Sequence, residues 1–179
     1  MKTKKMFIGL GAAAAFGAAI VPMTGYAVTD IDSKSVDVAL KVGATISMSL
    51  NNNKIEPSIL TSEDSVDKST IATVTTNSAS GYTLSATTST TGGALIGDTS
   101  SSNTISYVGS NYSSATTAGW ALSVGGSYKD ISGNKISLVP NGTPLANNEQ
   151  TTINYNFKTI GTTVPDTYKT TLTYTASVK

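Results

Sequence analysis

The residue types that could do chemistry in this chain are few, and the aromatic ones stand out first. Trp120 is the only tryptophan, and Leu122 and Val124 follow it at a spacing of two along one predicted strand. Such a tryptophan either anchors a core, where its side chain buries about 200 Å², or lies on the surface and contacts a carbohydrate or a partner. The alternating pattern favours the core interpretation and leaves the surface one open.

Three tyrosines lie close to this strand in the sequence, namely Tyr107, Tyr112 and Tyr128. Aromatic rings stack on sugars, so one interpretation is an exposed surface that binds a glycan. Tyrosine is equally common at half-buried strand positions, where the ring packs and the hydroxyl stays in water. The spacing of the three tyrosines does not distinguish the glycan-binding interpretation from the packing interpretation.

The composition excludes most enzyme classes. The 179 residues include no histidine and no cysteine, so neither a Ser-His-Asp set nor a zinc or copper site can form. Asp30, Asp32 and Asp37 stand close together, but the glycine and distal glutamate of a calcium loop are missing. The chain contains no arginine, the residue best suited to bind phosphate or guanine through two hydrogen bonds. We therefore predict no catalytic residue, no metal, no cofactor and no nucleic-acid partner.

The first 27 residues predict a secretory signal peptide. Lys2, Lys4 and Lys5 precede an apolar run from Met6 to Val21, and small residues end at Ala27. The run of 16 residues is too short for a stable span, because as a helix it reaches only about 24 Å. Cleavage after Ala27 leaves 9 lysines against 11 acidic residues. The predicted mature chain, residues 28–179, is a single secreted domain without a covalent sorting signal.

The strongest strand pattern lies between Val36 and Leu50, where every second residue is apolar. One buried face of a strand produces this period, and a helix does not. Because 15 residues are long for one strand, we expect a bend near Gly43.

Further strands are expected along the rest of the chain. Their ranges are 70–76, 81–87, 104–108, 119–124, 135–139, 151–159 and 168–178, whereas 89–103 is expected to be a loop or edge hairpin. Asn- and Gly-containing turns separate them. About eight alternating strands predict an all-β fold, an antiparallel β-sandwich of the immunoglobulin-like or jelly-roll-like kind.

Two short motifs resemble those of the WxL domain. Gly119-Trp120-Ala121-Leu122 is similar to its proximal Trp-x-Leu motif. At the C-terminal end, Tyr168, Leu172 and Thr173 match the frame of the distal motif, and Tyr174 and Ala176 replace its tryptophan and leucine. The resemblance covers roughly residues 70–179. It implies a bacterial surface protein that attaches non-covalently to peptidoglycan, with Trp120, Leu122, Tyr168, Leu172 and Tyr174 as the binding residues.

A second resemblance leads to a different function. Gly81-Tyr82-Thr83-Leu84 and the C-terminal segment starting at Asp166 are similar to pilin-like and spore-coat-like β-sandwich subunits. In those families strands exchange between subunits, and the alternating segment from Val36 to Leu50 would be the donor.

The sequence thus predicts a secreted, non-enzymatic protein of a bacterial cell surface or cell wall. Its expected partners are peptidoglycan or another surface glycan, or surface proteins, with self-association possible. The alternative is a structural subunit of a pilus, fibre or coat that assembles by strand exchange.

Overall fold

The computed structural model describes residues 36–59 and 65–179, so the predicted signal peptide lies outside the described residues. Residues Lys41–Lys179 form one compact unit, and the preceding residues fall outside it. Twelve strands and two short 3-10 helices are present in the described part of the chain. In chain order they are β1 (Ile46–Leu50), β2 (Ser65–Thr76), β3 (Tyr82–Thr88), η1 (Thr91–Gly93), β4 (Leu95–Gly97), β5 (Thr104–Tyr107), η2 (Gly109–Ser114), β6 (Gly119–Val124), β7 (Ser127–Tyr128), β8 (Ile131–Ser132), β9 (Lys135–Val139), β10 (Glu149–Lys158), β11 (Tyr168–Lys169) and β12 (Leu172–Val178).

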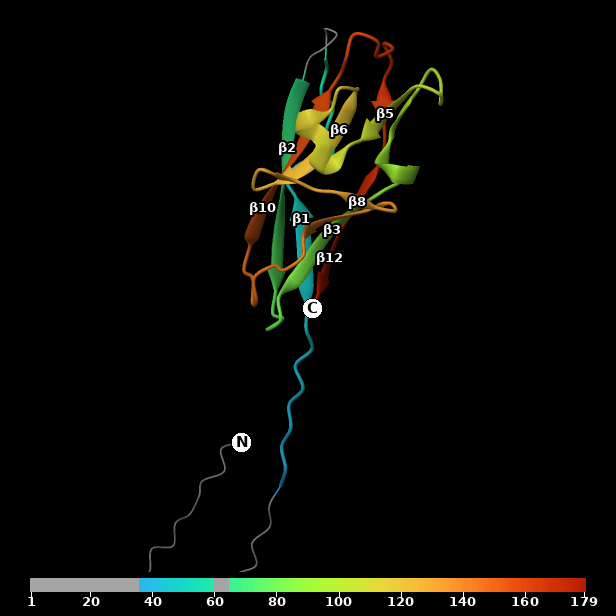
Figure 1. Cartoon of the computed structure of the whole chain (residues 1–179). Helices are drawn as coiled ribbons and strands as arrows, with labels where there is room; N and C mark the ends of the chain where they lie inside the picture. Colours follow the sequence, from blue (N-terminus) through green and yellow to red (C-terminus); the bar gives the residue numbers. More distant parts are fainter. Residues whose placement is uncertain (1–35, 60–64) are drawn as a thin grey trace, which may run out of the picture. The chain divides into compact units, whose positions relative to one another are not determined.

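The strands form two sheets, which confirms the predicted all-β, sandwich-like fold (Figure 1). The larger sheet has the order β1-β2-β10-β6-β5-β4-β11, with β7 added beside β6, and the smaller one has the order β12-β3-β9-β8. Neighbouring strands are antiparallel except for β5 and β6, which pair in parallel. The sheets end at β1 and β12, and these two edges come close to each other.

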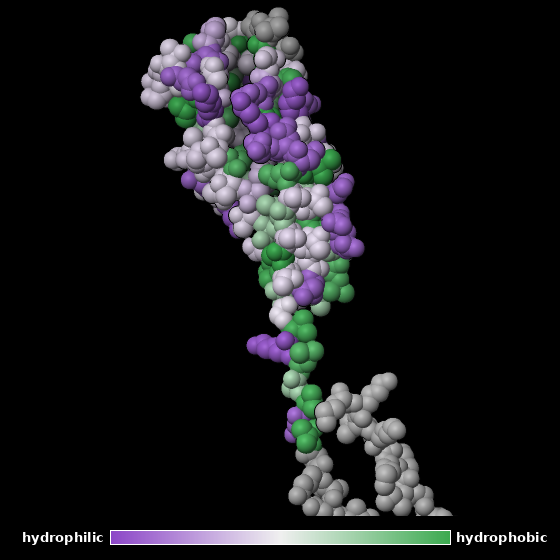
Figure 2. All heavy atoms as spheres, turned by 180° about the vertical axis from the view of Figure 1, so that it is seen from behind, coloured by the Kyte–Doolittle hydropathy of each residue, from purple (hydrophilic) through white to green (hydrophobic). Residues whose placement is uncertain are grey.

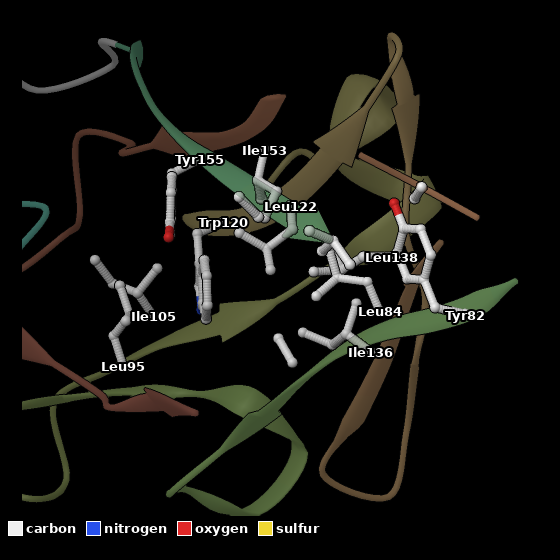
Figure 3. Close-up of a cluster of buried hydrophobic side chains, with 14 residues drawn as sticks. Tyr82, Leu84, Leu95, Ile105, Trp120, Leu122, Ile136, Leu138, Ile153 and Tyr155 are labelled. Carbon is white, nitrogen blue, oxygen red and sulfur yellow. The ribbon is translucent and has the colours of Figure 1, made fainter. Parts of the chain in front are cut away.

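The core lies between the inner faces of the two sheets. Strands of the larger sheet contribute Val74, Leu122 and Ile153, and β3 and β9 of the smaller sheet contribute Leu84 and Leu138. Each of these side chains is at most 1% exposed. Figure 3 shows Leu84, Leu122, Leu138 and Ile153 packed together. Along β2, β3 and β10 they alternate with polar residues, because successive side chains of a strand point to opposite faces of its sheet.

Most of the strand predictions are confirmed. β6 and β9 have the expected bounds, and β2, β3, β5 and β10 overlap their expected ranges. The range 168–178 is divided into β11 and β12, and the short β4 lies inside the range expected to be a loop or edge hairpin. In the residues that the structure describes, no helix is long and apolar enough to cross a membrane.

Candidate functional site

Trp120 is a core residue. Its side chain is 1% exposed, and the indole Nε1–H donates a hydrogen bond to the carbonyl oxygen of Gly93 over 2.9 Å. The Tyr107 ring meets it edge-on at a centroid distance of 4.9 Å, and Phe157 is stacked at 6.0 Å. Figure 3 shows the indole among the other buried side chains. The structure therefore agrees with the core interpretation and leaves the indole no surface for a ligand.

Tyr107 connects the Trp120 strand to its neighbour. Its hydroxyl donates to the Lys129 carbonyl oxygen over 2.5 Å and accepts the Leu122 N–H over 3.2 Å. Burial raises the pKa of Tyr107 to about 12. Leu122 itself is fully buried, so neither member of the Trp-x-Leu motif is at the surface.

The other predicted binding residues lie at the free ends of the sheets. Tyr168 is half-buried on β11, and its hydroxyl donates to the Val164 carbonyl oxygen. Leu172 and Tyr174 are half-buried on β12, where the Tyr174 and Tyr155 hydroxyls are 2.5 Å apart. Burial raises the pKa of Tyr174 far above its ordinary value. The five predicted residues are therefore divided between the core and the edges of both sheets, and they do not form one surface.

The three tyrosines near the tryptophan do not line up as an exposed surface. Tyr107 packs on Trp120, and Tyr112 is buried with its ring 5.1 Å from that of Tyr128. Burial raises the pKa of Tyr112 to about 12. Only Tyr107 and Tyr128 keep part of their surface in solvent, so these rings work mainly as packing elements.

One half-buried carboxylate, that of Asp166, is held by several hydrogen bonds. Asp166 accepts hydrogen bonds from the Thr99 N–H and hydroxyl, from Asn103 Nδ2 and from the Thr167 N–H. The Asn103 amide above all lowers the pKa of Asp166 to about 2. These contacts tie the loop after β4 to the loop before β11, which gives Asp166 a structural role. Across residues 36–59 and 65–179, no three acidic side chains gather in a way that would hold a metal ion; Asp30 and Asp32 lie outside the described residues.

The prediction of a strand from Val36 to Leu50 is wrong for its first ten residues. Only Ile46–Leu50 is a strand, and we call residues 36–45 the N-terminal arm. β1 begins at Ile46 because its partner β2 ends opposite it, at Thr76. The Asn77 side chain then takes the place of a further strand residue: it accepts the Thr45 N–H over 2.6 Å and donates to the Gly43 carbonyl oxygen over 3.0 Å.

The arm carries the most exposed large apolar side chains in the described part of the chain. Val36, Val38, Leu40 and Val42 are 74–91% exposed, so the apolar side chains along the arm are open to solvent (Figure 2). They share the parity of the inward-facing Ile46 in β1. The arm therefore has the alternating pattern of a strand, and no strand in the described part of the chain pairs with it.

A shallow groove of about 260 Å³ runs between the edges β1 and β12. Its lining residues are Ile46, Ser47, Met48, Tyr174, Thr175 and Ala176. Sequence reasoning missed this groove because it depends on which strands end the two sheets, and the alternating pattern alone does not show that. No protein-family model, curated protein or solved structure matches this chain.

Proposed function

We propose that this chain is a secreted, non-enzymatic protein of a bacterial cell surface that binds a surface partner through its N-terminal arm. The observation that carries the proposal is the row of four aliphatic side chains, 74–91% exposed, at alternating positions of the arm. Complete burial of such a side chain stabilises a complex by about 1.5–3 kcal/mol. Several hundred Å² of alternating apolar surface mark an interaction element.

The form of the arm favours one kind of recognition. An extended segment with one apolar face adds to a free sheet edge, where backbone hydrogen bonds provide affinity and alternate side chains enter pockets. The arm contains no proline between residues 36 and 45, so each of its residues has a backbone N–H for such a ladder, and that of Thr45 is already donated to the Asn77 side chain. This supports a structural subunit that assembles by strand exchange.

Size-exclusion chromatography with light scattering tests the proposal. The mature chain, Val28–Lys179, is compared over a range of concentrations with a variant in which Val36, Val38, Leu40 and Val42 are all serine. We expect concentration-dependent oligomers of the wild-type chain and a monomeric variant with an unchanged far-UV circular dichroism spectrum. Wild-type protein that stays monomeric at every concentration, alone and with its cell envelope fraction, would contradict the proposal.

Attachment to the cell wall is a second candidate function. It is favoured by the half-exposed positions of Tyr168 and Leu172 at the β11 and β12 ends of the sheets, in the segment that resembles the distal WxL motif. Sedimentation with purified peptidoglycan tests it, with Tyr168→Ala as the variant and Tyr128→Ala as the matched control. Loss of sedimentation in the Tyr168 variant alone supports wall binding, and equal behaviour of both variants counts against it.

A further inference from the structure

The inner faces of β1 and β12 are incompletely covered. Ile46 and Met48 on β1, and Tyr174 and Ala176 on β12, point toward the core but keep part of their surface in solvent. Their counterparts one strand farther in, such as Val74 on β2 and Leu84 on β3, are fully buried. Among the described residues the smaller sheet ends at β12, so none of its described strands covers the inner face of β1.

The edge of β12 also offers backbone hydrogen-bonding groups. Within the described residues, β12 pairs with β3 alone. Half of the backbone N–H and C=O groups of such an edge strand point away from its partner, and they are a template for one more strand. Its outward-facing residues are Thr173, Thr175 and Ser177, which carry no charge to repel a neighbouring strand.

We propose that the N-terminal arm of one copy of this protein adds as a strand beside β12 of a second copy, with its apolar face in the β1–β12 groove. This inference rests on the proposed function and names its acceptor. The arm is long enough to pair with the whole of β12, since the nine residues from Val36 to Ala44 span about 30 Å and the seven residues of β12 about 23 Å. Val36, Val38, Leu40 and Val42 would then cover the half-buried side chains of the groove.

The hydrogen bonds at the end of the arm next to β1 explain why the acceptor is a second copy. Gly43 and Thr45 are both hydrogen-bonded to the Asn77 side chain, and the Asn77 N–H also donates to the Thr45 carbonyl oxygen. To enter its own groove, the chain would have to reverse direction between Gly43 and Ile46 and break these bonds. Binding to the groove of a second copy leaves these hydrogen bonds intact.

This arrangement makes each copy both a donor and an acceptor. Because the arm and the groove are different surfaces, the contact is head-to-tail and repeats with every added copy. Such a contact produces an open chain of subunits unless its rotation closes a ring.

Directed disulfide exchange tests the proposed acceptor, and the chain suits it because it contains no cysteine. Ala39→Cys in the arm is activated as a mixed disulfide with thionitrobenzoate and added to a second, reduced protein that carries Thr175→Cys. Both positions are exposed and lie on the outward face of the proposed strand pair, where cross-strand neighbours meet disulfide geometry. The matched control is Thr152→Cys, which is exposed on β10, away from the groove.

We expect the Thr175 thiol, or that of Thr173→Cys or Ser177→Cys if the register is shifted, to form the mixed dimer roughly tenfold faster than Thr152→Cys. Replacing the four apolar arm residues by serine in the donor should remove this advantage. Oligomers that depend on the arm but show no preference for β12 would overturn the acceptor and leave the proposed function standing. A wild-type chain that stays monomeric alone and with its cell envelope fraction, together with equal exchange rates at all positions, would overturn both.

Discussion

Replacing Trp120 by phenylalanine is the sharpest test of the core described here. The change removes the indole N–H and leaves the buried Gly93 carbonyl oxygen, 2.9 Å away, without its donor. A buried polar group that loses its partner costs about 1–3 kcal/mol. The smaller ring also leaves space beside Tyr107 and Phe157, which adds about 1 kcal/mol. We therefore expect Trp120→Phe to lower the free energy of unfolding by about 2–4 kcal/mol.

Urea unfolding followed by far-UV circular dichroism measures this loss, since the variant has no tryptophan fluorescence to follow. The matched control is Tyr128→Phe, which removes a hydroxyl from a half-exposed ring on β7 and should change the free energy of unfolding by less than about 0.5 kcal/mol. A Trp120→Phe variant as stable as the control would refute the assignment of Trp120 as a core anchor. The expected loss also means that any effect of this variant on wall binding has to be measured on the folded fraction.

Three further predictions concern single positions. Asp166→Asn should destabilise the protein near neutral pH. Because the folded-state pKa of Asp166 is depressed to about 2, the greater stability of the wild type in urea should be complete above the ordinary carboxyl pKa of about 3.9 and disappear as the pH falls through about 2. A stability difference that stays constant over this pH range would contradict the prediction. The raised pKa of Tyr107, about 12, predicts the opposite sign, with stability present below pH 10 and lost between about pH 10 and 12. Because Tyr112 has a similarly raised pKa, Tyr107→Phe should make the alkaline loss, followed by circular dichroism, smaller without abolishing it. Gly142→Ala should lower the free energy of unfolding by about 1–3 kcal/mol, because its Cβ would lie 2.2 Å from the Tyr82 ring, whereas Gly43→Ala meets nothing within 4 Å and should leave thermal unfolding unchanged.

The sequence was sufficient for the strands along which large apolar residues alternate with smaller or polar ones and whose ends carry turn residues. β6 and β9 are examples, because apolar residues alternate along both and glycine lies at one or both ends. β4, in contrast, has only three residues, Leu95–Gly97, in a polar stretch. A segment that short holds no full period of alternation, so its pairing becomes visible only beside β5 and β11.

The arm shows that an alternating apolar pattern alone does not predict a paired strand. A period of two records which side chains share a face, and it does not record whether a partner strand is present. The partner strand of β1 ends at Thr76, and the Asn77 side chain bonds the residues before β1. The start of β1 therefore depends on residues that lie 30 or more positions away in the sequence. For the same reason the sequence left Trp120 open between core and surface, since its burial is produced by Gly93, Tyr107 and Phe157 from three other segments.

The pairing of β2 with β10 has a consequence for when the fold can form. This ladder joins residues 65–76 to residues 149–158, and β10 also holds β6 in place. A chain that emerges amino end first therefore lacks the centre of its larger sheet until about residue 158 is available. Contacts of such long sequence separation fold slowly, because a large loop has to close before they form. The larger sheet thus cannot form early in synthesis, and the protein should remain unfolded until almost all of it has been made.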